Sequence, residues 1–128
     1  MKRVFKTRTF NRWMRKSDLR DQDLCRAVSE MEQGLIDTHL GGHVVKKRVA
    51  LAGRGKRGSA RTLVATNLEG RWFFLFGFEK NERANIDDDE LRVLQETARD
   101  LLRFNHSEIA AAVFKGELLE ICHDYQDA

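Results

Sequence analysis

One segment of the chain, RWFFLFGFEK at residues 71–80, is apolar on both sides of an extended strand. Successive side chains of a strand point to opposite faces, so a run without polar alternation is typical of a strand that is buried on both faces. We therefore expect it at the centre of a sheet, covered by a helix on at least one side. An aromatic row can also stack nucleic-acid bases, but the continuous run favours the core. The expected faces are Trp72, Phe74, Phe76 and Phe78 on one side and Phe73 and Leu75 on the other.

The densest positive charge falls in residues 44–61, VVKKRVALAGRGKRGSAR, which contain no carboxylate. The valines predict a strand, GRGKRGS predicts a glycine-rich loop, and the loop closes a hairpin onto ARTLVAT. Arg offers a planar fork of donors and Lys a mobile point charge, so a lattice of both on a sheet suits phosphates. The alternative is a solvated hairpin that only keeps the protein soluble. The seven cations are Lys46, Lys47, Arg48, Arg54, Lys56, Arg57 and Arg61.

The rest of the chain carries patterns of short strands and helices. Residues 3–7 predict a first strand, and apolar residues at helical spacing predict two helices within residues 10–34. Asp87 followed by Glu90 predicts the start of a third helix, and Ser107 the start of a short fourth one. The predicted fold is a single α+β domain of 128 residues, with a small antiparallel or mixed sheet of about four strands, an N-terminal helical hairpin and C-terminal helices. We expect the last ten or so residues to form a frayed tail.

Charge is segregated along the chain. Residues 1–66 carry 16 basic and 6 acidic side chains, whereas residues 67–128 carry 7 basic and 14 acidic ones. A basic half fits a nucleic-acid partner, because neutralised phosphates release counterions. The sequence has no run of eighteen apolar residues and no signal-peptide core, so we expect a cytoplasmic protein without membrane contact.

Neither the cysteines nor the histidines follow a metal-binding pattern. Cys25 and Cys122 lie far apart without CxxC or Cys/His spacing, and we expect both to be reduced, buried thiols rather than a disulfide. His39 and His43 are four residues apart, but within a glycine-rich connector that does not support helical ligand geometry. We expect no metal and no cofactor.

Two phrases, LGGHVVKKRVALAGRGKRGSARTLVA and RWFFLFGFEKNERANI, together resemble the RelE/HigB type of toxin from bacterial toxin–antitoxin systems. The similarity covers roughly residues 3–104. It implies a small α+β protein that inhibits translation, most often by metal-independent cleavage of mRNA in the ribosomal A site. It also implies a cognate antitoxin, of the helix-turn-helix type. We expect this antitoxin to use the cationic cleft and the apolar residues Leu118, Leu119 and Ile121 of the acidic C-terminal part.

The family pattern is incomplete at the expected active site. Related toxins such as RelE have Arg and Tyr in a GKRERS-x-x-Y ending, where this chain has Asn81 and Asp87. An active enzyme would therefore use a lysine of the cluster as base, because neighbouring positive charges disfavour the protonated form of a lysine, or the ribosome would supply part of the chemistry. The alternative is a toxin or regulator that binds a nucleic-acid machine and an antitoxin without cutting. The expected catalytic residues are Lys56 or Lys80 as the base, between which the sequence does not decide, and Arg61 and Arg83 as stabilisers of the phosphorane, with Lys46, Lys47, Arg48, Arg54 and Arg57 as further RNA contacts.

Overall fold

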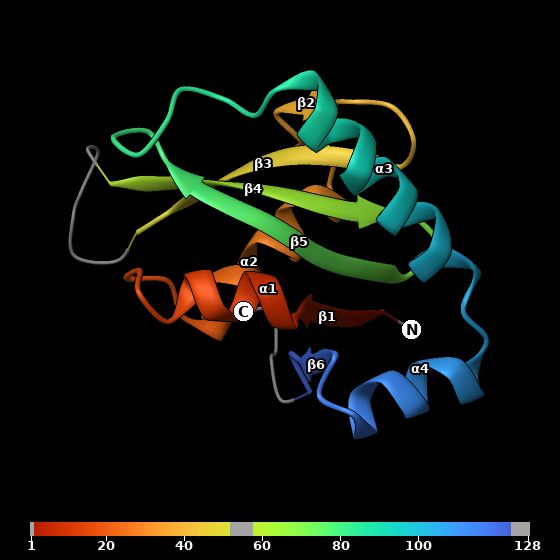
Figure 1. The fold of residues 1–128 in the computed structure, drawn as a ribbon. Helices are drawn as coiled ribbons and strands as arrows, with labels where there is room; N and C mark the ends of the chain where they lie inside the picture. Colours follow the sequence, from red (N-terminus) through yellow and green to blue (C-terminus); the bar gives the residue numbers. More distant parts are fainter. Residues whose placement is uncertain (1, 52–57, 124–128) are drawn as a thin grey trace.

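The computed structural model describes residues 2–51 and 58–123. They form a six-stranded mixed sheet with four helices (Figure 1). The α+β class is confirmed, but these residues alone supply six strands where about four were expected. The strands are β1 (Arg3–Thr7), β2 (Thr38–His39), β3 (Val44–Ala50), β4 (Ser59–Thr66), β5 (Arg71–Glu79) and β6 (Leu118–Ile121), and the helices are α1 (Arg8–Met14), α2 (Asp21–Glu32), α3 (Asp88–Arg103) and α4 (His106–Phe114).

The sheet brings the two ends of the described chain together. Its strand order is β2-β3-β4-β5-β1-β6. β3, β4 and β5 pair antiparallel in sequence order, which confirms the hairpin predicted for β3 and β4 and its continuation into β5. β1 pairs parallel with β5, with Val4 opposite Trp72, and β6 pairs antiparallel with β1. β5 therefore lies in the interior of the sheet, as its two apolar faces predict.

Two helices cover each face of the sheet. After the first strand, α1 and α2 place Phe10 and Leu24 in one buried cluster with Trp72 of β5, and we call this side the α2 face. α3 and α4 place Leu101 and Ile109 in a second buried cluster with Phe73, Leu63 and Val44 on the opposite side, the α3 face. Figure 1 shows α2 behind the sheet and α3 in front of it.

A β-bulge changes the predicted alternation of side chains along β5. In the register of β4 with β5, Val64 lies opposite Phe74 and Leu63 opposite Phe76, so that Leu75 is an extra residue. An extra residue reverses the direction of the side chains that follow it. Phe76 consequently packs with the α3 face rather than with Trp72 and Phe74, as the uninterrupted alternation predicted, while Gly77 faces Trp13 of α1.

The C-terminal part of the chain is a strand where a frayed tail was expected. Leu118 and Ile121 of β6 are buried, and they pair with Thr7 and Val4 of β1, so that β6 is the last strand of the sheet on the side of β1. They are therefore core residues and do not supply the exposed apolar surface for an antitoxin that the sequence suggested. Residues 124–128 lie outside the described residues.

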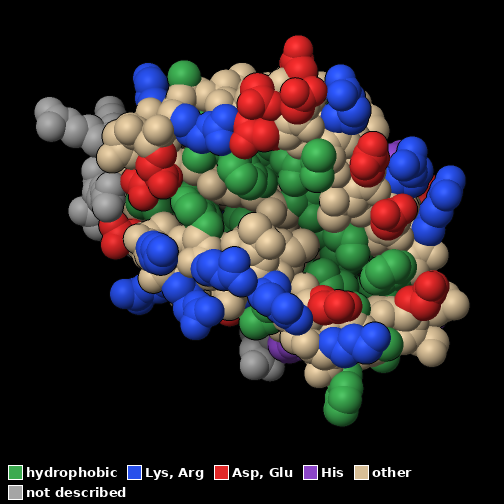
Figure 2. All heavy atoms as spheres, viewed as in Figure 1, with side chains coloured by type: hydrophobic (Ala, Val, Ile, Leu, Met, Phe, Trp, Pro, Cys, Tyr) green, Lys and Arg blue, Asp and Glu red, His purple; other side chains and the backbone are tan. Residues whose placement is uncertain are grey.

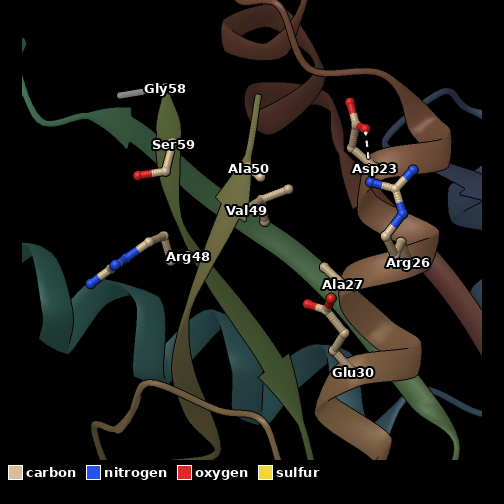
Figure 3. A pocket seen from close by; sticks show the side chains of 9 residues that line it. All are labelled: Asp23, Arg26, Ala27, Glu30, Arg48, Val49, Ala50, Gly58 and Ser59. Atoms are coloured by element: carbon tan, nitrogen blue, oxygen red, sulfur yellow. Dashed lines mark ion pairs between the residues drawn. The ribbon is translucent and has the colours of Figure 1, made fainter. Parts of the chain in front are cut away.

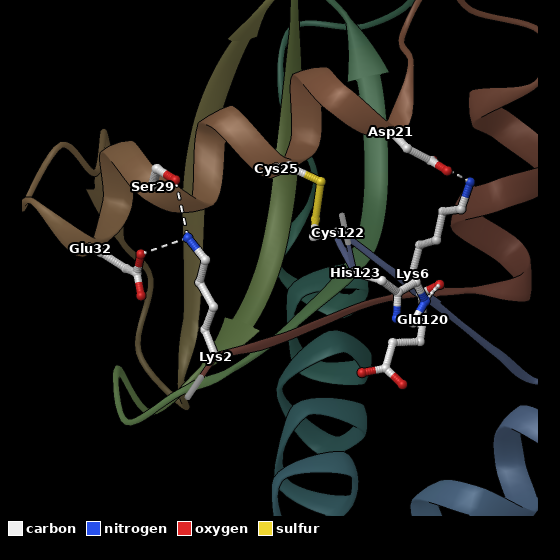
Figure 4. The surroundings of a disulfide bond; sticks show 9 residues. All are labelled: Lys2, Lys6, Asp21, Cys25, Ser29, Glu32, Glu120, Cys122 and His123. Atoms are coloured by element: carbon white, nitrogen blue, oxygen red, sulfur yellow. Dashed lines mark hydrogen bonds and ion pairs between the residues drawn. A yellow bond between two sulfur atoms is a disulfide. The ribbon is translucent and has the colours of Figure 1, made fainter. Parts of the chain in front are cut away.

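The expectation of two reduced thiols is wrong in this structure. Cys25 of α2 and Cys122, the residue after β6, form a disulfide (Figure 4). Their separation of 97 residues gave no hint of contact. The pairing of β6 with β1 carries Cys122 to the α2 face, where Cys25 belongs to the buried cluster.

The starts of the C-terminal helices agree only in part with the sequence. The side chain of Asp87 accepts from the backbone N–H of Glu90, whose own carboxylate accepts from the N–H of Asp87, which confirms the predicted capping pair of α3. Asn105 rather than Ser107 caps α4, because the acceptor for its reciprocal bond is Glu108, three residues later.

Candidate nucleic-acid interface

Positive charge gathers on the α3 face of β3 and β4. Val44 and Leu63 belong to the cluster beneath α3, and side chains two or four residues along each strand point the same way. Lys46 and Arg48 of β3 and Arg61 of β4 therefore lie on this face, with Arg48 directly opposite Arg61. Arg48 is exposed, and Lys46 and Arg61 are half-buried. We call these three residues the cationic face.

Within residues 2–51 and 58–123 the side chains of the cationic face form no ion pair, although the carboxylate of Asp37 accepts from the backbone N–H of Arg48 at 2.6 Å. Arg61 donates from Nη1 to Oγ of Ser59 at 3.0 Å, and in this part of the chain the side chains of Lys46 and Arg48 form no ion pair or hydrogen bond. Like charges directly opposite one another on a sheet repel. An anion that bridges Arg48 and Arg61 would remove this repulsion, so the arrangement is suited to a phosphate.

Lys47 does not belong to this surface. It points to the α2 face, where its buried Nζ donates to the carbonyl oxygen of Leu35 at 2.9 Å and pairs with Oε1 of Glu30 at 2.9 Å. Its charge is balanced inside the fold, and an RNA on the α3 face would not reach it.

Arg83, the expected stabiliser at the end of β5, is held by a carboxylate. Its guanidinium forms a two-pronged pair with Glu90 of α3, donates from Nε to the carbonyl oxygen of Asn85 at 3.0 Å, and lies 5.8 Å from the centre of the Phe76 ring. The hydrogen bonds that Arg83 donates to Glu90 raise the pKa of Arg83 above its usual value. The bonds from Arg83 and from the Asp87 backbone hold the pKa of Glu90 below its usual range. Arg83 is thus a fixed planar group whose charge is largely compensated.

The remaining expected site residues are dispersed or lie outside the described residues. Lys80 and Asn81 are exposed in the turn that follows β5, and Asp87 is committed to capping α3. Within the described residues the structure thus brings Lys46, Arg48 and Arg61 together, with Arg83 beside Phe76 of the neighbouring strand. The predicted site residues outside the described ranges are Arg54, Lys56 and Arg57.

A second row of cations, on α1 and the two residues that follow it, was not predicted as a site. Arg8, Arg12, Arg15 and Lys16 are exposed and recur at helical spacing, and α1 contains no acidic residue. Figure 2 shows positive side chains in a row over α1 and acidic ones over the beginning of α3. Arg8 donates to the carbonyl oxygens of Gly116 and Lys115, both at 3.1 Å. The helical spacing is visible in the sequence, but it does not distinguish an RNA contact from a solvated helix face.

A cavity of about 170 Å³ lies between α1 and the last half of β5. Its walls are mostly apolar and aromatic, in contrast to the charged surfaces on α1 and on the cationic face. We call it the α1–β5 cavity. It is lined by Thr9, Phe10, Trp13, Leu75, Phe76, Gly77, Phe78, Glu82 and Arg83.

Another cavity, on the α2 face, has charges of both signs (Figure 3). Asp23, Arg26 and Glu30 of α2 line it opposite β3, and Arg26 pairs with Asp23 at 3.6 Å. Figure 3 shows the side chain of Arg48 on the far side of β3, pointing away from α2. The balanced charges make this cavity a poor site for a phosphate.

The described residues contain no group of three or more His, Cys, Asp or Glu side chains that could hold a metal ion. Among their helices there is none whose length and apolar character would suffice to cross a membrane.

The chain was compared with models of known protein families and with curated proteins. Residues 2–121 match the family model of the RelE toxin of the RelE/RelB toxin–antitoxin system. No curated protein matches the chain.

Proposed function

The chain belongs to the RelE toxin family, and we propose that it inhibits translation by cutting mRNA on the ribosome. The observation that carries this proposal is the cationic face, because three cations on two adjacent strands, whose side chains form no ion pair within the described residues, are arranged for the phosphates of an extended RNA. The family match supports the toxin role. The cytoplasm, which holds mRNA and ribosomes, is the proposed site of action.

The proposed chemistry is an attack of a ribose 2′-oxygen on the adjacent phosphorus. This step breaks the bond from phosphorus to the 5′-oxygen and leaves a 2′,3′-cyclic phosphate and a 5′-hydroxyl. Arg48 and Arg61 are positioned to donate hydrogen bonds to the phosphorane, where negative charge grows. These roles need positioned donors and no cofactor.

The general base in this proposal is a lysine. Lys46 lies two residues from Arg48 on the same face, beside the position proposed for the phosphate. Lys80 and Lys56 remain candidates for the same role. The described part of the chain places no tyrosine or histidine among the cations of this face. We therefore propose that the proton for the leaving oxygen comes from a lysine of the cluster or from the ribosome.

A toxin that binds without cutting is the second candidate. It is favoured by the commitment of Arg83 to Glu90 and of Asp87 to the helix cap, which leaves few groups for acid–base chemistry. Both candidates include a cognate antitoxin, proposed to be of the helix-turn-helix type, whose acidic segment would cover the cationic face.

Transcript mapping during growth arrest separates the two candidates. The protein is induced in a bacterium, and the 5′ ends of transcripts are sequenced before and after arrest. New 5′ ends inside codons support cleavage if their appearance requires Arg61. Arrest with intact mRNA would contradict it and support the binding toxin. Copurification of the neighbouring gene product tests the antitoxin.

A further inference from the structure

The α1–β5 cavity opens at the part of β5 whose edge no longer pairs with β1. β1 pairs with β5 only from Arg71 to Phe74, although β5 continues to Glu79. Beyond Phe74 the chain of β1 has turned into α1, which runs alongside the rest of β5. The cavity therefore lies between a helix face and the side of a strand, with aromatic side chains from both.

Trp13 of α1 forms one wall in a fixed position. A Cβ atom added at Gly77 would come within 2.3 Å of the indole Cζ3, so the ring lies directly on the backbone of β5. Its Nε1 donates to Oε1 of Glu82 at 3.3 Å, and the same oxygen accepts from the backbone N–H of Glu79 at 2.6 Å. The ring is half-buried, so part of it remains accessible.

Phe76 and Arg83 contribute two more planar groups to the lining. Phe76 is half-buried and is 6.3 Å from the ring of Phe78, centre to centre. The guanidinium of Arg83 lies 5.8 Å from the centre of the Phe76 ring and is held there by Glu90. Rings and guanidinium planes are the groups on which unpaired bases stack. All are fixed by contacts within the protein, so little ordering is needed when a ligand binds.

Cations lie on both sides of this cavity. On one side is the α1 row that includes Arg12 and Arg15, and on the other is Arg61, which lies opposite Phe78 in the register of β4 with β5. Figure 2 shows hydrophobic side chains reaching the surface above the row of cations on α1. An apolar protein segment would gain nothing from this positive border, whereas a nucleic acid has phosphates on both sides of each base.

We propose that the α1–β5 cavity holds one unstacked base of single-stranded RNA. The phosphates that flank this base lie on the α1 cations on one side of the cavity and on the cationic face on the other. The inference rests on the proposed function, since it assigns a base subsite to the same RNA. The other possible occupant, an apolar side chain of the antitoxin, is an outcome of the test below.

The test uses a labelled single-stranded RNA octamer and a set of matched octamers, each of which has one abasic nucleotide at a different position. Binding is followed at low salt by anisotropy and by tryptophan emission. Trp72 is buried, so quenching reports on Trp13. One abasic position should abolish the quenching. Trp13→Ala should weaken binding of the intact RNA roughly five- to 150-fold, as loss of a base–aromatic stack does.

Three variants control for folding and for loss of an aromatic ring. Phe114→Ala removes a ring that is 92 % exposed on α4, outside the cavity, and should leave RNA affinity unchanged. Trp13→Phe retains a ring and should lose less affinity than Trp13→Ala. Gly77→Ala displaces the indole and should reproduce the loss. Thermal melting verifies that each variant is folded.

The outcomes distinguish this inference from the proposed function. If RNA binds but the abasic octamers and the Trp13 variants bind equally well, the base subsite is overturned and the proposed function stands. If Trp13→Ala weakens the antitoxin complex and leaves RNA binding unchanged, the cavity is a protein-binding site and the inference is wrong. If no octamer binds the wild-type protein, the subsite is also overturned, and transcript mapping alone decides the function.

Discussion

On the α2 face of β3, Lys47 is buried and balanced by Glu30, whereas on the α3 face of the same strand the side chains of Lys46 and Arg48 form no ion pair among the described residues. The difference arises from what covers each face. α2 brings Asp23 and Glu30 towards the strand, and both are used within the fold. The acids at the start of α3 are used differently, because Glu90 pairs with Arg83 and Asp87 caps the helix. The same residue type therefore stabilises the fold on one face and is available to an anion on the other.

The disulfide lies on the α2 face, and its removal should give the largest change in stability. Cys25 and Cys122 are 97 residues apart, and a cross-link over such a loop restricts the unfolded chain, which is worth about 4 kcal/mol. We expect Cys122→Ala to lower the free energy of unfolding by about this amount in oxidising buffer, with RNA binding at the cationic face unchanged. Urea denaturation with and without reductant measures it.

Urea denaturation with and without reductant also tests whether the disulfide between Cys25 and Cys122 is present. Wild-type protein should lose a similar free energy when a reductant is added, and the variant should not respond. A wild-type protein that unfolds identically in both buffers would contradict the disulfide and restore the reduced thiols expected from sequence. In the proposed cytoplasmic location thiols are kept reduced, so β6 would there be held by its pairing with β1.

Arg61→Ala tests the α3 face and should reduce activity without unfolding the protein. Loss of a donor that meets the phosphorane costs on the order of 3 kcal/mol, roughly a hundredfold in rate. Cleavage rates on translating ribosomes and growth arrest measure this loss. Arg26→Ala is the matched control, because Arg26 is an exposed cation on α2 that pairs with Asp23. Equal losses in both variants would show that overall charge, and not the cationic face, supports activity.

Lys47 should give the reverse result, with lost stability and retained chemistry. Lys47→Met keeps the apolar stem but leaves the carbonyl oxygen of Leu35 without its donor, which costs about 2 kcal/mol. Glu30 is 43 % exposed, so the carboxylate left behind is solvated and adds little. Chemical denaturation should show the loss, and cleavage per folded molecule should remain near the wild-type rate. A folded variant that cannot cut would assign Lys47 to the RNA site after all.

The sequence predicted the sheet better than the site. Periodicity identified β3, β4 and β5, because alternation within a strand and glycines between strands are local signals. It could not reveal that β6 pairs with β1, nor that Cys122 reaches Cys25, because both depend on contacts between distant segments. The one-residue bulge at Leu75 likewise has no clear local signal, yet it decides that Phe76 faces α3.

For the site, composition identified the cationic segment but not its division between two faces. Strand periodicity does separate Lys46 and Arg48 from Lys47, but the sequence does not show which face lies under a helix that carries acids. Arg83 was predicted beside the other cations, and its pairing with Glu90 depends on how α3 returns over the sheet. The wall formed by Trp13 depends in the same way on α1 lying beside Gly77.

The smallest expected effect concerns the ion pair of Arg83 with Glu90, which compensates the charge of Arg83 so that it does not add to the cationic face. Hydrogen bonds from Arg83 lower the pKa of Glu90 in the folded protein. A carboxyl whose pKa is lower when folded contributes stability above its unfolded pKa, near 4.3, and loses that contribution as the pH falls through its folded pKa. Glu90→Gln should therefore be slightly less stable than wild type at pH 7, and the difference should vanish at low pH.

Melting temperatures of wild type and Glu90→Gln between pH 7 and pH 2 measure this difference. The pKa of Glu120 is also lowered, because Glu120 accepts bonds from Arg3, but this residue is present in both proteins and its contribution to the pH dependence cancels. Asp89→Asn, which removes the exposed partner of Arg92, is the control and should show a smaller difference.

Glu90→Gln also releases the charge of Arg83 next to the α1–β5 cavity. RNA affinity should then rise, with a steeper salt dependence, because one more cation is available to phosphate. Unchanged affinity and salt dependence would mean that Arg83 lies off the path of the RNA, and would limit the proposed interface to the cationic face and α1.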